Sequence, residues 1–473
     1  MSAEATPAPP RALAGGEVAG IWARHLTSLL LPVNALLFLF SGPHPWYVAP
    51  LFMLPVVLAY VLDTNLRVER RQPLDTLPAW PFDALVYLLA ALQLAVVFGI
   101  ARLFALQDVF SVDMVVLVTA VGGSSGFAII TAHELIHRRK PWERLLGRLV
   151  LCTVLQEHFF TEHLRGHHVR VGRPDDPATA RFGESYRDFY RRTVPAQFRG
   201  AWQLEHRRLA QAGESRLWHN RVLQGLVVGW GMAFCVGWVA GLAGFVAFLL
   251  QAFFASRLLE AVNYFEHWGL ERSGARVDPC DSWDTHAWFT YYGLTGLSRH
   301  ADHHCEPTRP FQQLRVREQV PMLPTGYVGM VDMVMAQNDE FRKIAREELQ
   351  RTGLGPFAPG ASPPAEPDPA EQPSRQIAGW HRLPSWLRTG LAAALVVLAA
   401  TAGPRLVGDS VAPESFLGQA LLNAWILVTF LGMFRVESRL EAAGSGPLAA
   451  WSLALALLLA VGLASERLLS LLV

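Results

Sequence analysis

Nine histidines with short, regular spacings stand out among the residues of this sequence that could do chemistry. They lie in four segments of a chain that contains 16 histidines. Imidazoles gathered in this way are typical of metal sites. The nine are His133 and His137 in H-E-L-I-H, His163, His167 and His168 in E-H-L-R-G-H-H, His267 in N-Y-F-E-H, and His300, His303 and His304 in R-H-A-D-H-H.

The spacing within the segments predicts helices that aim pairs of imidazoles in one direction. Residues four apart lie above one another on a helix face, so both members of such a pair can reach one metal. The pairs are His133 and His137, His163 and His167, and His300 and His304, and His303 is expected on the same flank as His300.

The first segment also matches H-E-x-x-H, the helical signature of zinc proteases, in which the glutamate activates water. A catalytic zinc takes three protein ligands, and no third ligand follows His137 at a familiar protease spacing. Nine histidines are enough for two metals with four or five ligands each. Because imidazole suits iron, copper and zinc alike, the residues alone do not name the metal.

The composition indicates which elements must position these histidines. The 473 residues are 51% hydrophobic and 17% charged, and apolar runs close to the spanning length of about 20 residues recur along the chain. We therefore predict an all-α polytopic membrane protein. The runs are Ile21–Ser41, Tyr47–Leu62, Phe82–Leu106, Val109–Ala132, Val222–Val239, Gly241–Val262, Trp386–Thr401, Phe416–Phe434 and Ala449–Leu472.

The order of the runs predicts four regions. A Pro/Ala-rich tail at 1–20 does not resemble a cleavable signal. A core at 21–345 has six spans, the histidine segments and a cytoplasmic cap. A Pro-rich linker at 346–385 then leads to a three-span module at 386–473.

Arginines in the loops predict the orientation. Arg67, Arg70 and Arg71 follow the second run, and Arg435 and Arg439 follow the eighth. Positively charged loops stay in the cytoplasm. With the N-terminus inside, four spans return the chain to the cytoplasm at His133 and two more return it there at His267.

Other classes of function lack their usual sequence features. The net charge is +1 and no basic stripe interleaved with aromatic residues appears, so we expect no nucleic-acid partner. The four cysteines form no C-x-x-C, which excludes a fused rubredoxin, and no G-x-G-x-x-G follows a strand-like run. A metal transporter would carry charged residues at mid-span. The predicted spans are nearly free of such residues, and Asp113 is the main exception.

The four segments, in this order, resemble the histidine boxes of the integral-membrane alkane hydroxylases, the AlkB-type alkane 1-monooxygenase family that includes xylene monooxygenase. The resemblance covers residues 20–345. Arg138 stands where the family's first box has Lys, and Trp268 stands where its hydrocarbon-hydroxylase box, here NYFEHWGL, has Tyr. The matching stretches are HELIHR, EHLRGHHVRVGRPDDPA, NYFEHWGL, LSRHADHHCEPTRPFQQL and LPTGY at 323–327.

The resemblance implies that the nine histidines hold two iron ions, with no catalytic residue beyond that di-iron site. It implies a monooxygenase that inserts one atom of O2 into a terminal C–H bond of an n-alkane, drawn from the lipid bilayer, to give a 1-alkanol. Electrons would come from rubredoxin or ferredoxin with its NAD(P)H reductase. The expected location is the bacterial inner membrane, with the active site on the cytoplasmic side.

Four carboxylates stand directly beside ligand histidines: Glu134, Glu162, Glu266 and Asp302. Metal-bound imidazoles commonly donate their other N–H to a carboxylate, so we expect these four to orient ligands. Salt bridges to nearby arginines are the alternative. Whether His286 or Cys305 touches the site stays open.

Three other functions remain open on sequence alone. A fatty-acyl or lipid desaturase would use the same metal site, although the NYFEHWGL segment argues against it. Hydroxylation of an alkyl-aromatic methyl group and an intramembrane zinc protease are the other two. Trp268, Ala301 and Cys305 depart from the boxes and leave the substrate open.

Overall fold

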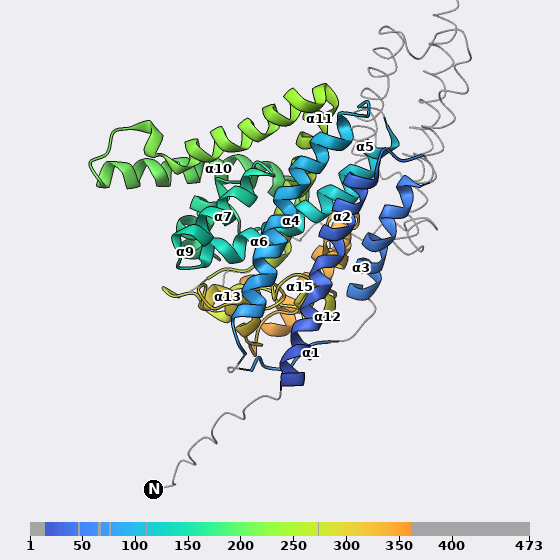
Figure 1. Ribbon diagram of the computed structural model, residues 1–473. Coiled ribbons are helices and arrows are strands. Elements are labelled where there is room, and N and C mark those ends of the chain that lie inside the picture. Colours follow the sequence, from blue (N-terminus) through green and yellow to red (C-terminus); the bar gives the residue numbers. More distant parts are fainter. Residues whose placement is uncertain are drawn as a thin grey trace, which may run out of the picture. The chain divides into compact units, whose positions relative to one another are not determined.

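The computed structural model describes residues 15–360, except 46–47, 65–67, 75–76, 110 and 273. Within these residues the chain is helical, and its extended segments meet only at two isolated bridges, Val68 with Ala287 and Asp284 with Met322 (Figure 1). The predicted all-α class is therefore confirmed for the described part. The predicted C-terminal spans and most of the predicted linker lie outside it.

Four helical segments are long and apolar enough to cross a membrane. The pairs α2/α4, α4/α11, α4/α6 and α6/α11 pack against each other. The segments are Gly16–Ser41, which covers all but the first residue of α1 (Gly15–His25) and the whole of α2 (Leu30–Ser41); α4 (Trp80–Phe104); Val112–His137, which includes α5 (Val112–Val116) and α6 (Gly122–His137); and α11 (Arg221–His267).

The predicted six-span core is recovered in part. The second run forms a shorter apolar helix, Ala49–Thr64, which includes α3 (Leu54–Thr64). The fifth and sixth runs form the two arms of α11, with a break between them at Gly241.

Gly241 reverses the course of α11. Its φ of 62° is left-handed, a conformation that costs glycine little. The rings of Phe234 and Phe245 stack with centroids 5.6 Å apart, whereas eleven helical residues would span about 16 Å. The two arms therefore fold back on each other, and Trp238 near the bend is 92% exposed, as expected of a side chain that faces lipid.

Small residues allow the spans to approach closely. A Cβ atom added to Gly126 of α6 would lie 2.5 Å from Leu258 Cδ1 of α11, and one added to Gly122 would lie 3.0 Å from Phe254 Cβ. Close approach through glycine is the usual way for helices to pack in a membrane. This packing holds α6, which carries the first two histidines, against α11, which ends at His267.

Helices outside the spans, together with the turns between them, carry the remaining histidines and cover them. The long polar helix α10 begins where Ser185 accepts a hydrogen bond from Asp188 N, an N-cap that satisfies a free helical donor. The helices outside the spans are α7 (Pro141–Cys152), α8 (Phe159–Glu162), α9 (His168–Arg170), α10 (Tyr186–Gln211), α12 (Trp288–Gly293), α13 (His300–Cys305), α14 (Tyr327–Ala336) and α15 (Asn338–Thr352).

Asp113, the charged residue within a predicted span, belongs to a second compact unit that includes Pro43–Leu51 and Gln107–Val115. Its Oδ1 lies 2.9 Å from His44 Nδ1, and its Oδ2 accepts a hydrogen bond from Gln107 at 2.9 Å. A carboxylate that is paired in this way near a helix start does not resemble the mid-span ion site of a transporter.

Candidate metal centre

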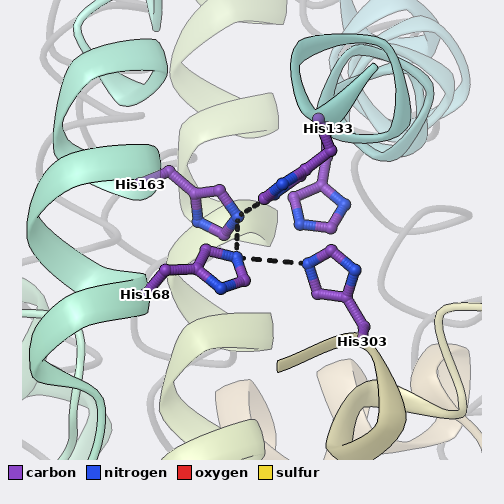
Figure 2. Close-up of side chains that lie close together, drawn as sticks. His133, His163, His168 and His303 are labelled. Carbon is purple, nitrogen blue, oxygen red and sulfur yellow. Dashed lines mark hydrogen bonds between the residues drawn. The ribbon is translucent and has the colours of Figure 1, made fainter. Parts of the chain in front are cut away.

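The nine histidines selected from the sequence lie in two groups. Within each group the ligand nitrogens lie within 4.8 Å of one another. We call the groups the five-histidine cluster and the four-histidine cluster, and Figure 2 shows part of the first. The five-histidine cluster is His133, His137, His163, His168 and His303, and the four-histidine cluster is His167, His267, His300 and His304.

The imidazoles in each cluster turn their Nε2 atoms toward a common point. In the five-histidine cluster, His163 Nε2 lies 3.0 Å from His168 Nε2 (Figure 2). It also lies 3.0 Å from His137 Nε2. In the four-histidine cluster, His300 Nε2 lies 2.9 Å from His304 Nε2 and 3.2 Å from His267 Nε2. A neutral imidazole has one N–H, so these nitrogens cannot all donate and accept among themselves, whereas a bound cation would accept every lone pair.

Burial favours the neutral form that a metal requires. Burial first, and then the neighbouring imidazoles, lowers the pKa of His163 and His168 well below the usual 6.5. The same two causes lower the pKa of His303. At neutral pH these side chains keep a free lone pair, so the donor set fits a divalent transition metal.

A π-helical turn divides the second segment between the clusters. Residues His163–His167 form this turn, in which the hydrogen bonds run from i to i+5. His163 and His168 therefore enter the same cluster, and His167 enters the other. The sequence-based pairing of His163 with His167 is wrong, because it assumed a regular α-helix.

The last segment divides similarly, although α13 is an ordinary helix. His300 and His304 share the four-histidine cluster, as their spacing predicts. His303 joins the five-histidine cluster, so its expected place beside His300 is wrong. Successive helical residues turn by about 100°, and this separates His303 from His304 enough to face the other cluster.

The two clusters adjoin one another. The rings of His168 and His304, one from each cluster, stack with centroids 4.4 Å apart at an angle of 27°. Eight of the nine histidines are buried, and His168 is the one with intermediate exposure. Two metals held here would be neighbours in one protein-lined centre.

Three of the four selected carboxylates pair with arginine instead of imidazole in the described part of the chain. Glu134 also accepts a hydrogen bond from Phe311 N at 3.4 Å, so its carboxylate is engaged away from the clusters. The arginine partners are Arg138 for Glu134 (2.7 Å), Arg170 for Glu162, and Arg309 and Arg317 for Asp302 (both 2.6 Å).

Glu266 is the selected carboxylate that does approach a cluster. Its Oε2 lies 3.2 Å from His300 Nε2, the nitrogen that faces the other imidazoles. This differs from the expected contact, which was to the outer ring nitrogen.

Asp176 was not selected from the sequence, yet it makes the expected contact. Its Oδ2 lies 2.9 Å from His167 Nδ1 and accepts a hydrogen bond from Thr179 Oγ1 at 2.7 Å. Burial would raise the pKa of Asp176, but attraction to His167 and these hydrogen bonds lower it. The sequence feature that could have identified Asp176 is its place in the P-D-D-P-A tail of the second box, nine residues after His167.

His286 and Cys305 belong to neither cluster among the described residues. His286 is half-buried, and its backbone oxygen accepts a hydrogen bond from Glu69 N at 2.7 Å. Burial raises the pKa of the Cys305 thiol to about 11, so it is protonated at neutral pH and is a poor metal ligand.

Comparison with known proteins identifies the class. The fatty acid desaturase family profile matches residues 112–327. A buried histidine centre at the ends of membrane-spanning helices, within that profile, defines a membrane metal-dependent oxidoreductase.

Individual proteins similar to this chain define the family more narrowly. Alkane 1-monooxygenase 1 of Alcanivorax borkumensis is 34% identical over 355 residues, which cover 70% of this chain and 86% of that protein. Alkane 1-monooxygenase 1 of Pseudomonas aeruginosa is 39% identical over 214 residues, covering 44% of this chain and 56% of that protein. The chain belongs to the alkane 1-monooxygenase family and is an integral membrane protein.

A more distant relative is the xylene/toluene monooxygenase hydroxylase component of Pseudomonas putida. It is 24% identical over 205 residues, which cover 42% of this chain and 54% of that protein.

Proposed function

We propose that this protein is a membrane non-haem di-iron monooxygenase that converts an n-alkane to a 1-alkanol. The observation that carries the proposal is the pair of adjoining clusters, with five and four buried imidazoles. Their number suits two iron ions, each with room for a further ligand. The nine histidines would hold the metals, and Asp176 and Glu266 would orient ligands of the four-histidine cluster.

An alkane offers no acid, base or electrophilic group, so side chains alone cannot attack its C–H bond. Bound iron would supply O2 activation, and the balance is R–H, O2, two electrons and two protons giving R–OH and water. The protein's own part is to bind the alkane, orient its terminal carbon and exclude water.

The spans enclose one small cavity near the centre, on the side from which such a substrate would approach. This cavity of about 20 Å³ lies between α2, α4, α6 and the turn after α12. It is lined by Pro32, Leu89, Phe127 and Thr131, and Thr131 is two residues before His133. The cavity holds about one water molecule, so an alkane must displace these side chains to enter.

We place the centre on the cytoplasmic side of a bacterial inner membrane, with rubredoxin or ferredoxin and its NAD(P)H reductase as electron donor. The arginine-rich loops support this side. The partial exposure of His168 supports electron entry there from a soluble protein. We also propose that residues 21–345 form the catalytic core and that the linker and residues 386–473 form an appended module.

Removal of two hydrogens is a second candidate, because the matching profile is that of fatty acid desaturases. The product distinguishes the two reactions, since a desaturase releases an alkene and retains no oxygen. Hydroxylation of an aryl methyl group is a third possibility, suggested by the distant xylene/toluene relative.

The proposal can be tested with purified protein supplied with iron, rubredoxin, reductase and NADH. Octane, hexadecane, xylene and stearate are offered separately under ¹⁸O2. We expect about two irons per chain and an ¹⁸O-labelled 1-alkanol. An active protein with one zinc, or an alkene product, would overturn the proposal.

Paired variants give the control. His304→Ala removes a ligand of the four-histidine cluster and should abolish alcohol formation with loss of iron. His206→Ala changes an exposed histidine of α10 outside both clusters and should retain both iron and activity.

A further inference from the structure

Tyr327, the last residue of the L-P-T-G-Y segment, is a buried tyrosine that the proposed chemistry does not use. It is the first residue of α14 and is 0% exposed. Its ring packs edge-on against Phe265 with centroids 4.8 Å apart. A buried phenol needs a hydrogen-bond partner, and that partner leads to the metal centre.

The Tyr327 hydroxyl donates a hydrogen bond to Glu266 Oε1 at 2.7 Å. The other oxygen of the same carboxylate, Oε2, lies 3.2 Å from His300 Nε2. The phenol also lies 3.1 Å from Leu297 O, but it has one hydrogen and the carboxylate is nearer. The carboxylate is thus held at one end by Tyr327, and its other end reaches the nitrogen at which the four-histidine cluster converges.

The backbone of Tyr327 is fixed independently of its side chain. Tyr327 N donates to Thr290 Oγ1 at 2.8 Å, and Thr290 Oγ1 in turn donates to Asp63 Oδ1 at 2.5 Å. Val328 N donates to Asp63 Oδ2 at 2.8 Å. Asp63, from α3, therefore caps the start of α14 and sets the position from which the phenol extends.

The glycine before the tyrosine permits this cap. A Cβ atom at Gly326 would lie 2.1 Å from Asp63 Oδ1, so any other residue would push the carboxylate away. The L-P-T-G-Y segment therefore places a phenol at a fixed point beside Glu266.

We propose that Tyr327 is a positioning residue for the four-histidine cluster, which it serves by holding the Glu266 carboxylate against the metal-facing side of His300. The proposal rests on the proposed function, because it assumes a metal at this cluster. Imidazole binds a metal through a neutral ring and so does not balance the charge of a divalent cation, whereas a fixed carboxylate beside the ligands supplies one negative charge. Without the phenol, the buried carboxylate loses a donor and can rotate away from this position.

The test is Tyr327→Phe, which removes only the hydroxyl and keeps the ring against Phe265. Protein stripped of metal is titrated with Co²⁺, and the visible absorption bands follow the two sites separately. We expect about a 10- to 100-fold weaker affinity at one of the two sites and a much smaller change at the other. This is the usual size for loss of such a supporting partner. A purely structural defect would weaken both sites together.

Tyr186→Phe is the matched control. Tyr186 is also buried and its hydroxyl donates to a backbone oxygen, that of Arg257, at 2.8 Å. This variant loses a comparable hydrogen bond away from the clusters, so both cobalt sites should keep the wild-type affinity.

A double-mutant cycle tests the path through Glu266. Glu266→Gln should weaken the same site, and the double variant should be no worse than the more severe single variant. Wild-type affinities in Tyr327→Phe, or additive losses in the double variant, would overturn the inference. If Tyr327→Phe does not accumulate, unchanged cobalt binding in Glu266→Gln overturns it equally. Failure of the wild-type protein to bind two metals would instead overturn the proposed function.

Discussion

The contact between Asp176 and His167 leads to a quantitative prediction. Asp176 is buried, and its Oδ2 lies 2.9 Å from the outer nitrogen of His167. This contact fixes which nitrogen carries the hydrogen and so leaves Nε2 free for a metal. Asp176→Asn keeps the size of the side chain and removes its charge.

The expected size of the effect follows from what asparagine can replace. Oδ2 of Asp176 accepts from both His167 and Thr179, and Oδ1 accepts from Ala178 N at 3.3 Å. The amide group of asparagine must therefore face at least one of these donors, and the negative charge beside His167 is lost. We therefore expect an affinity loss of about 10- to 100-fold at the four-histidine cluster, equivalent to about 1.4–2.7 kcal/mol. The five-histidine cluster should lose much less affinity, because its ligands make no contact with Asp176 in the described structure.

The assay is titration of metal-free protein with Fe²⁺ under anaerobic conditions, followed by alcohol formation per bound iron. Asp175→Asn is the control, since Asp175 is the exposed neighbour of Asp176. Unchanged iron affinity in Asp176→Asn, or an equal loss at both sites, would refute the reasoning that the carboxylate orients one ligand.

Three further predictions follow from other parts of the chain. Glu134→Gln should retain both irons and lose less than about 10-fold in turnover, because Glu134 pairs with Arg138; complete inactivation with full metal would restore the protease hypothesis. Burial raises the pKa of Glu157 to about 7 from its usual 4.5, against the attraction of Arg148. As the pH rises from 4.5 to 7, the unfolded chain releases this proton before the folded chain does. Over this range the wild type should therefore lose up to about 3 kcal/mol of stability relative to Glu157→Gln. Melting temperatures of the two proteins that stay parallel over this range would contradict the prediction. Truncation after Gly360 should leave iron content and alcohol formation intact, and loss of either would place the C-terminal region within the catalytic unit.

The sequence was informative about the identity of the ligands and less so about their arrangement. Spacing and resemblance selected nine histidines, and these are the nine that the structure gathers. The division of His163, His167 and His168 between the clusters depends on the π-helical turn at His163–His167, whereas their spacing in the sequence also fits a regular α-helix. The sequence could therefore predict that the imidazoles meet, but not which of them meet.

The outer partners illustrate the same limit. Adjacency along the chain suggested Glu134, Glu162 and Asp302, yet neighbouring helical residues point in different directions, and these three reach arginines instead. Asp176 reaches His167 because the chain turns back after α9, which is a tertiary effect. The apolar runs on either side of Gly241 predicted two spans that return the chain to the same side, and the structure adds that the break between them lies at this one residue.

The π-helical turn has a consequence for how the two sites communicate. Three ligands for two sites lie within the six residues from His163 to His168, on one short and continuous piece of backbone. A metal that settles His163 and His168 also fixes the backbone that carries His167, so part of the entropy of ordering the second site is already lost when the first is filled. Filling the sites should then be cooperative, and by thermodynamic reciprocity, withdrawal of either metal should loosen the other.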